Sequence, residues 1–344
     1  MRALVIHAAR DLRLETHDDP PAPGAGEVLV RIDRGGICGS DLHYYQDGGF
    51  GTVRVREPMV LGHEVAGHVA ALGDGVTGLA VGDLVAMSPS HPCKSCTYCL
   101  AGLPNHCLNM RFYGSAMRMP HVQGGFRDFV VDSAENAVKA DGLTAGEAAM
   151  AEPLSVCLNA VRLAGQMLGK RVLVTGCGPI GLLTVLVARR AGAKEIVATD
   201  IAPFALEMAI TAGANRAVNV AVDPGAMEQY AEAKGYFDVH IECAGVPSAL
   251  ATGVASVKPR GTIVQLGLGG DMTVPVQAIT TKELSLKGSF RFHEEFAIAV
   301  SMMQQRLIDV RPLITHTMPM ADAVAAFALA ADRKQAMKVQ LDFA

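Results

Sequence analysis

Residues 171–200 read RVLVTGCGPIGLLTVLVARRAGAKEIVATD, and this stretch decides the fold. The apolar run 171–175 predicts a buried strand, the turn Gly176–Gly181 follows at once, and residues 182–191 predict an apolar helix. A second predicted strand, 195–200, ends in an acid, Asp200. Glycines in G-x-G-x-x-G spacing between a strand and a helix let a pyrophosphate meet the backbone N–H groups, and the acid accepts from ribose hydroxyls. A plain structural turn is the alternative, but the strand, helix and acid around the glycines favour a dinucleotide-binding (Rossmann) unit.

The alternation of strands and helices continues beyond this unit. Helices are predicted over 203–212, 226–234 and 247–257, strands over 217–219, 237–243 and 261–266, and two further short strands within 282–289. This order predicts an α/β, doubly wound parallel sheet whose ligand lies at the carboxyl ends of the strands. The expected cofactor contacts are Gly176, Gly178, Pro179, Ile180, Gly181, Asp200, Cys243, Ala244, Gly267, Ser289 and Phe290.

Asp200 also bears on the choice of cofactor. Its charge repels a 2′-phosphate, and Ile201-Ala202-Pro203 supplies no Arg to pair with one. The sequence therefore favours NAD over NADP.

Composition bounds the remaining possibilities. With 344 residues, half of them hydrophobic, the chain predicts two domains. A net charge of −4 without a basic block argues against nucleic acid as a partner. The longest largely apolar run, 181–188, is too short to span a membrane, and the N-terminus lacks a signal-peptide pattern. We expect a cytoplasmic protein whose eight cysteines serve thiol or metal chemistry rather than disulfide formation.

The N-terminal part is β-rich and holds one candidate metal site. Cys38 is followed by Ser40 and His43, and His63-Glu64 comes after a Gly-rich interval. A thiolate, an imidazole and a carboxylate are zinc-ligand types, and three protein ligands leave one position open for chemistry. A buried thiol with an unrelated histidine is the alternative on spacing alone.

Four further cysteines form the most specific signal. They stand in C-x2-C-x2-C-x7-C order, which predicts a closed, all-thiolate structural zinc site. An iron–sulfur cluster is the main competitor. The four residues are Cys93, Cys96, Cys99 and Cys107.

A second carboxylate, Glu152, is a further candidate site residue. Residues 147–168 have helical periodicity, and Glu152 stands there just before Pro153 in an otherwise apolar segment. A solvent-facing glutamate at a helix N-terminus is the alternative to a site residue.

With these motifs in this order, the whole chain resembles the zinc-containing medium-chain alcohol dehydrogenases. Gly62-His63-Glu64, Gly67, Gly73 and Val76 match the zinc signature of that family in spacing. The resemblance implies one catalytic zinc, held by Cys38 and His63 with Glu64 or Glu152, and one structural zinc. Glu152 stands where many relatives have a second cysteine, which is the pattern of the polyol branch. The implied architecture is a GroES-like catalytic domain, 1–152 and 291–344, with an NAD-binding Rossmann domain, 153–290.

Within the polyol branch, several segments are most similar to the L-idonate 5-dehydrogenase group. They include 34–46, 110–117, 288–292 and 338–341. The resemblance implies a substrate pocket lined by Tyr44, Phe112, Glu152 and Arg291. Because a guanidinium matches an aldonate carboxylate, oxidation of L-idonate to 5-ketogluconate is favoured, with sorbitol, xylitol or a butanediol as the alternative. Because sorbitol dehydrogenases carry a similar Arg, Arg291 alone does not distinguish an aldonate substrate from a neutral polyol.

The predicted mechanism uses zinc to acidify the substrate hydroxyl before hydride passes to the nicotinamide. Ser40, His43 and Glu152 are the predicted proton carriers, and Asp41 is expected to orient His63. A non-catalytic NAD- or redox-sensing module of the same fold is the alternative from another class, and the intact set of site residues argues against it. The family likeness implies a homodimer or homotetramer that acts on a small molecule, without nucleic acid or membrane partners.

Overall fold

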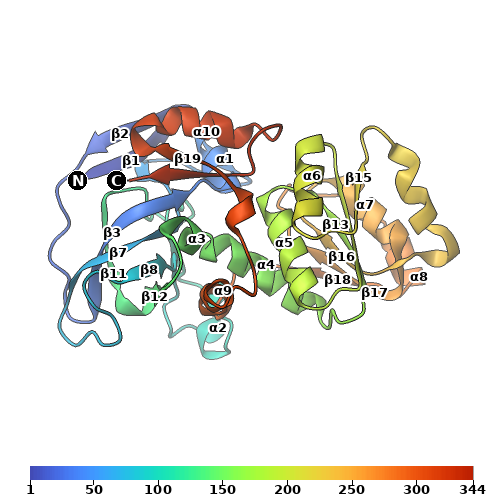
Figure 1. Ribbon diagram of the computed structural model, residues 1–344, viewed down its shortest axis with the longest axis horizontal. Helices are drawn as coiled ribbons and strands as arrows, with labels where there is room; N and C mark the ends of the chain where they lie inside the picture. The colour runs from blue at the N-terminus through green and yellow to red at the C-terminus, as the bar shows by residue number, and fades with distance from the viewer. Residues whose placement is uncertain (344) are drawn as a thin grey trace.

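The computed structural model describes residues 1–343 as two lobes joined by a helix (Figure 1). Both chain termini lie in the lobe on the left of Figure 1, so the chain leaves this lobe and returns to it. The lobe on the right holds the parallel sheet.

The left-hand lobe is built mainly on antiparallel strands, with β19 and β20 as a parallel pair. Its largest sheet runs in the order β12-β8-β7-β3-β20-β19, with β11 also paired to β3. The bounds are β3 Glu27–Gly36, β7 Glu64–Leu72, β8 Leu84–Met87, β11 Phe129–Ser133, β12 Ala137–Lys139, β19 Ile314–Pro319 and β20 Lys338–Asp342. The pairing of β20 with β3 confirms that the last strand returns to the first part of the chain.

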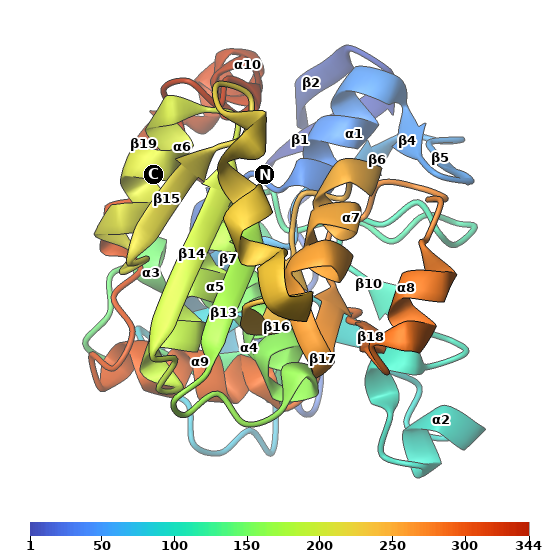
Figure 2. The same cartoon turned by 90° about the vertical axis from the view of Figure 1, so that its right-hand side faces the viewer.

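Smaller sheets and short helices complete this lobe. A three-stranded sheet comprises β1 (Arg2–Ala8), β2 (Asp11–Thr16) and β6 (Met59–Val60). Two hairpins pair β4 (Gly49–Phe50) with β5 (Val53–Arg54) and β9 (Ser90–His91) with β10 (Arg111–Phe112). The helices are α1 Gly39–Asp47, α2 Thr97–Leu100, α3 Ala145–Ala149, α9 Glu295–Gln304 and α10 Ala323–Ala331. In Figure 2, α2 projects from the lower right of the molecule.

The right-hand lobe is the predicted doubly wound sheet. Six parallel strands run in the order β15-β14-β13-β16-β17-β18, so the order reverses between β13 and β16. The strands are β13 Arg171–Thr175, β14 Glu195–Asp200, β15 Arg216–Asn219, β16 Phe237–Glu242, β17 Val257–Gln265 and β18 Ser285–Gly288. Helices α5 (Pro179–Arg190) and α6 (Pro203–Thr211) cover one face, and α7 (Pro247–Ser256) and α8 (Val276–Thr281) lie on the other (Figure 1). A crevice at the strand-order reversal is where such sheets bind ligands.

Three local predictions were wrong. The helix predicted over 226–234 is two 3-10 helices, Pro224–Tyr230 and Glu232–Lys234, and Ala233 at φ 49° breaks the helical path. Residues 282–289 form one strand rather than two, because Glu283 turns the chain at φ 50°. The predicted helix over 147–168 is divided at Met150 into α3 and α4 (Ala151–Ala164).

That division places Pro153 in the first turn of α4. A proline is tolerated there because the first helical N–H groups have no partner within the helix. Glu152 therefore stands at the start of α4, and it is buried rather than solvent-facing.

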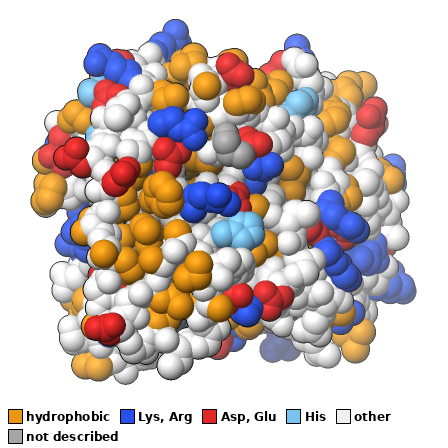
Figure 3. Space-filling model, turned by 60° about the vertical axis from the view of Figure 1, so that its left-hand side comes forward, with side chains coloured by type: hydrophobic (Ala, Val, Ile, Leu, Met, Phe, Trp, Pro, Cys, Tyr) orange, Lys and Arg blue, Asp and Glu red, His pale blue; other side chains and the backbone are white. Residues whose placement is uncertain are grey.

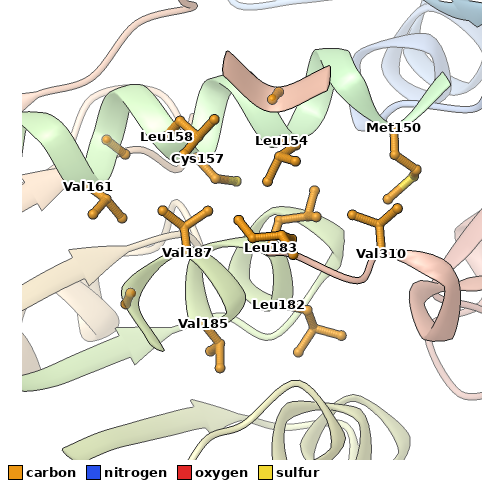
Figure 4. Close-up of a cluster of buried hydrophobic side chains, with 14 of the residues drawn as sticks. Met150, Leu154, Cys157, Leu158, Val161, Leu182, Leu183, Val185, Val187 and Val310 are labelled. Carbon is orange, nitrogen blue, oxygen red and sulfur yellow. The ribbon is translucent and has the colours of Figure 1, made fainter. Parts of the chain in front are cut away.

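One apolar core joins the two lobes. Leu154, Cys157 and Val161 of α4 face Leu183 and Val187 of α5, and Met150, the N-cap residue of α4, lies beside Val310 (Figure 4). The same cluster reaches Ala66 and Ala86 in the antiparallel sheet and Val172 in the parallel sheet. The helix that begins beside Glu152 is thereby packed against the helix that begins at the glycine loop.

The surface is mixed in character. In the view of Figure 3, hydrophobic side chains gather on the left, and Lys and Arg side chains lie mainly toward the right with Asp and Glu among them. Within residues 1–343, no helix is long and apolar enough to cross a membrane.

Candidate active site

Cys38 lies at the junction between β3 and α1. It is the N-cap residue of α1, and its backbone N–H donates to Oδ2 of Asp41 at 3.0 Å. Asp41 is fully buried and also accepts from the N–H of Gly62 at 3.3 Å. The carboxylate thus ties the Cys38 turn to the segment that carries His63.

Glycines allow these two segments to approach. A methyl group on Gly36 would lie 2.1 Å from Oε2 of Glu64, and one on Gly62, at φ 90°, would lie 2.1 Å from the ring of Phe126. Both positions therefore require the absence of a side chain.

The structure brings three of the predicted ligands together. One atom each from Cys38, His63 and Glu64 lies within 4.8 Å of the others. His63 and Glu64 are 6% and 1% exposed, so water competes little with a bound ion there. A thiolate, an imidazole and a carboxylate at this spacing suit zinc. Nδ1 of His63 lies 3.8 Å from Oδ1 of Asp41, so the predicted orienting contact is near but not a hydrogen bond.

Glu64 has a partner that the sequence analysis missed. Nζ of Lys338, in β20, donates to both carboxylate oxygens of Glu64, at 2.8 and 2.7 Å, and to the carbonyl of Ile37 at 3.2 Å. Burial lowers the pKa of Lys338, but the charges of Glu64, Cys38 and Glu152, together with the hydrogen bond to Glu64, outweigh burial, and the pKa is raised. A lysine in the apolar run of the final strand was the available signal, because a buried charge needs a partner.

Glu152, in α4, interacts with the charges of His63 and Glu64, but its oxygens lie outside the group of ligand atoms that are within 4.8 Å of one another. It is 6% exposed, and burial raises its pKa to about 7 against the opposing charge of His63. A buried carboxylate without an ion pair suits a metal ligand better than one whose oxygens both accept from an ammonium group.

The four-cysteine segment forms a second group of sulfur ligands. Their four Sγ atoms lie within 4.8 Å of one another, and no disulfide joins them. Backbone N–H groups of Cys93 and Asn109 donate to Sγ of Cys107, at 3.1 and 3.3 Å. Such donors stabilise thiolates, and backbone hydrogen bonds also lower the pKa of Cys93 to about 5. Four preorganised sulfurs fit the closed tetrahedral site of a structural zinc.

The glycine loop lies where the parallel sheet changes order. Gly176, at φ 83°, has no room for a side chain, because a methyl group there would lie 2.7 Å from the backbone nitrogen of Ala244. Oδ2 of Asp200 accepts from the N–H of Cys177 at 2.6 Å. This hydrogen bond connects the residue that is predicted to bind the ribose to the glycine loop.

A cavity of about 220 Å³ passes over this loop and between the lobes. It is lined by Gly178, Pro179 and Asp200 from the parallel sheet side, by Gly39 and His43 from α1, and by Arg333 after α10. His43 is exposed, and its Nδ1 lies 3.2 Å from Oδ2 of Asp47. The glycine loop, Asp200 and His43, which were predicted as site residues, therefore line one cavity. Arg333, which also lines it, was not predicted as a site residue.

The other predicted cofactor residues lie at the ends of neighbouring strands. Cys243 and Ala244 follow β16, Gly267 follows β17, and Ser289 and Phe290 follow β18. A side chain at Gly267 would meet the backbone nitrogen of Gly245 at 2.3 Å, so this edge is closely packed.

Two of the predicted substrate residues, Phe112 and Arg291, lie in a row beside His63. The ring of Phe112 lies 5.7 Å from that of His63, and the guanidinium of Arg291 lies 4.4 Å from the Phe112 ring centre. The hydroxyl of Tyr44 accepts from the N–H of Ala116 at 3.0 Å. Burial lowers the pKa of Arg291, while the nearby Glu152 carboxylate opposes this change. The carbonyl of Arg291 accepts from Nδ2 of Asn159 at 3.0 Å, which fixes a backbone at φ 56°.

A Rossmann sheet, a GroES-like lobe and two groups of zinc-ligand side chains together define a zinc-dependent, nicotinamide-linked dehydrogenase. Residues 24–142 match the alcohol dehydrogenase GroES-like domain and residues 179–305 match the zinc-binding dehydrogenase domain. The chain belongs to the zinc-binding alcohol dehydrogenase family, within which it is an NAD(P)-linked polyol dehydrogenase.

Individual relatives are similar over nearly the full length. The L-idonate 5-dehydrogenase (NAD(P)(+)) of Escherichia coli K12 is 44% identical over 321 residues, 92% of each chain. The sorbitol dehydrogenase of Pongo abelii is 38% identical over 331 residues, which are 94% of this chain and 91% of the relative. The crystal structure of L-idonate 5-dehydrogenase from Escherichia coli K-12 superposes with a TM-score of 0.94 at 41% identity, covering 99% of this chain and 98% of that one.

Proposed function

We propose that this chain oxidises the C5 hydroxyl of L-idonate to give 5-ketogluconate, with NAD as the preferred acceptor. The observation that carries the proposal is Arg291, a partly buried guanidinium near the metal ligands that has no hydrogen bond to a carboxylate within residues 1–343. An aldonate supplies the missing carboxylate, whereas a neutral polyol does not. The similarity to L-idonate 5-dehydrogenase supports the same substrate.

We assign the catalytic zinc to Cys38 and His63 with Glu152 in preference to Glu64, because Lys338 already donates to both carboxylate oxygens of Glu64 and Glu152 is buried facing His63. Bound by these residues, a zinc ion would supply Lewis-acid chemistry and lower the pKa of the substrate hydroxyl. Phe112 and Tyr44 line the substrate pocket, and Arg291 binds the anionic end of the substrate. The apolar core shared by α4 and α5 keeps the metal site facing the cofactor crevice. Ser40 and His43 lie on the α1 side, and the exposed His43 releases the proton to solvent.

The cofactor proposal rests on the glycine loop and Asp200. The glycines admit the pyrophosphate, and the Asp200 carboxylate accepts from the ribose hydroxyls and repels a 2′-phosphate. The part of the crevice that receives the nicotinamide is lined by the strand-end residues Cys243, Ala244, Gly267, Ser289 and Phe290. Cys93, Cys96, Cys99 and Cys107 hold the structural zinc. The domain bounds proposed for this arrangement are 1–152 with 291–344, and 153–290.

Assembly and compartment are also proposals. Every residue of β18 is exposed, and this strand is the edge of the six-stranded sheet. An open strand edge is a template for pairing with another strand, which supports a homodimer or a tetramer built from such dimers. The eight free cysteines suit a reducing compartment, in accord with a cytoplasmic enzyme.

Sorbitol or xylitol oxidation is the second candidate, favoured by the 38% identity to sorbitol dehydrogenase. The test measures reduction of NAD and NADP by zinc-assayed enzyme with L-idonate, D-gluconate, sorbitol and xylitol at mildly alkaline pH. The highest kcat/KM with L-idonate and NAD supports the proposal. A preference for sorbitol or xylitol would keep the enzyme class and reject the aldonate substrate.

A further inference from the structure

A second cavity lies outside the metal site, between the four-cysteine segment and the end of β18. Its volume is about 310 Å³, and one wall is residues 105–108, next to the last cysteine ligand. Nδ2 of Asn105 donates to the carbonyl of Phe290 at 3.1 Å, which closes this wall against the parallel-sheet lobe. Two arginines, Arg118 and Arg291, line the cavity, and none of the described residues that line it is an Asp or Glu.

Arg118 is held in place by the backbone rather than by an acid. Its Nε donates to the carbonyl of Met110 at 3.0 Å, and its Nη2 donates to the carbonyl of Leu108. Among the described residues no hydrogen bond or ion pair involves Nη1. A guanidinium has five N–H donors in a rigid fork, so the two at Nη1 remain available to an anion.

Arg291 presents the second charge. Its guanidinium lies 4.4 Å from the ring centre of Phe112 and 4.8 Å from that of Phe290. Its only hydrogen-bond contact from the side chain within residues 1–343 is from Nη2 to the sulfur of Met117 at 3.4 Å, and a thioether is a weak acceptor. A partly buried cation between two rings, without an acid, is arranged to bind an incoming anion.

These groups form a row that leads from the metal ligands to the two arginines. His63 contacts Phe112, Phe112 contacts Arg291, and Arg291 shares the outer cavity with Arg118. An anion bound by both arginines is therefore separated from the metal ligands by at least one aromatic ring. A substrate that spans this distance must carry its charge several carbons from the hydroxyl that reacts.

We propose that Arg118 and Arg291 form a two-arginine site for the terminal carboxylate of the substrate, and that Arg118 is a specificity-determining residue that favours aldonates over neutral polyols. The inference deepens the proposed function and rests on it for the identity of the substrate. It also gives the four-cysteine segment a role in recognition, since Leu108, which follows Cys107, holds Arg118.

The test compares Arg118→Gln with Arg111→Gln. Arg111 is exposed, lies seven residues away and does not line the cavity, so its variant controls for the loss of one positive charge. We expect Arg118→Gln to lower the ratio of kcat/KM for L-idonate to that for sorbitol about 10- to 100-fold, the effect of one charge-assisted hydrogen bond. Arg111→Gln should leave the ratio unchanged, and Arg118→Lys should restore part of it.

A binding measurement separates this inference from the proposed function. Hexanoate has a carboxylate but no hydroxyl to oxidise, and we expect calorimetry on the zinc-loaded enzyme with NAD to give a Kd at least tenfold weaker in Arg118→Gln than in Arg111→Gln. If L-idonate is not a substrate but this difference in Kd is found, the proposed function fails and the anion site stands. An equal loss of kcat/KM on both substrates, or equal Kd values in the two variants, would overturn the site.

Discussion

The buried pair of Lys338 and Glu64 allows a quantitative test of the site. The two side chains are 2% and 1% exposed, and the ammonium group donates to both carboxylate oxygens at 2.7 and 2.8 Å. Replacing the lysine in Lys338→Met leaves a carboxylate without its partner in a dry environment. Breaking a buried pair on one side costs about 3–5 kcal/mol of unfolding free energy. This is a large part of the roughly 5–15 kcal/mol that stabilises a typical protein.

The assay is urea denaturation of the zinc-loaded enzyme, followed by far-ultraviolet circular dichroism. We expect Glu64→Met/Lys338→Met to recover most of the loss, because replacing both charges removes the unpaired one. Arg13→Met is the control, since Arg13 pairs with Asp11 on the surface and its loss should change nothing measurable. A loss below about 1 kcal/mol in Lys338→Met, or no recovery in the double variant, would refute the buried charge pair.

Three further predictions concern the metal sites, the cofactor and the parallel sheet. Cys38→Ser should lose one zinc per chain and its turnover with little change in Tm, whereas Cys99→Ser should lose the other zinc and have a lower Tm. Metal analysis and thermal unfolding would measure both effects. Full turnover in Cys38→Ser would contradict the assignment of the catalytic metal site. Asp200→Asn should raise the ratio of kcat/KM for NADP to that for NAD about tenfold or more, and an unchanged ratio would remove Asp200 from cofactor choice. Burial lowers the pKa of His240 from 6.5 to about 3, so the unfolded state takes up the proton first and stability falls below pH 6.5. Between pH 7 and pH 5 the wild type should lose about 2 kcal/mol more than His240→Asn in urea unfolding, and equal losses would contradict the buried neutral ring.

Much of the fold could be predicted because its signals are local. The glycine loop needs a strand before it, a helix after it and an acid at the next strand end, and all of these are read from consecutive residues. The strand order 15-14-13-16-17-18 then follows the doubly wound pattern. The errors fell where one residue outweighs a pattern: Ala233 and Glu283 adopt positive φ values that no periodicity reveals.

The sequence could indicate which residues the structure brings together at the two sites, but not their ion pairing. Cys38, His63 and the four cysteines are residue types that bind zinc, and the spacing of the four cysteines favours a closed metal site. Whether Glu64 or Glu152 completes the catalytic set depends on Lys338, which lies 274 residues from Glu64 in the sequence. Only the pairing of β20 with β3 and of β3 with β7 brings that lysine to the carboxylate. Arg118 and Arg333 were missed for the same reason, since an arginine in a loop has no local signature.

The two lobes have to be positioned relative to each other for hydride transfer, because the reacting carbon and the nicotinamide must meet at contact distance. Glu152 opens α4, and the glycine loop opens α5. The two helices share one buried cluster that includes Leu154 and Leu183 (Figure 4). Cavities in such a core cost about 2–5 kcal/mol for Leu→Ala, so Leu154→Ala should destabilise the enzyme. If the cluster also sets the spacing of the two sites, this variant should lower kcat more than it raises KM for either substrate. A loss of stability with unchanged kcat would mean that the antiparallel and parallel lobes are positioned by other contacts.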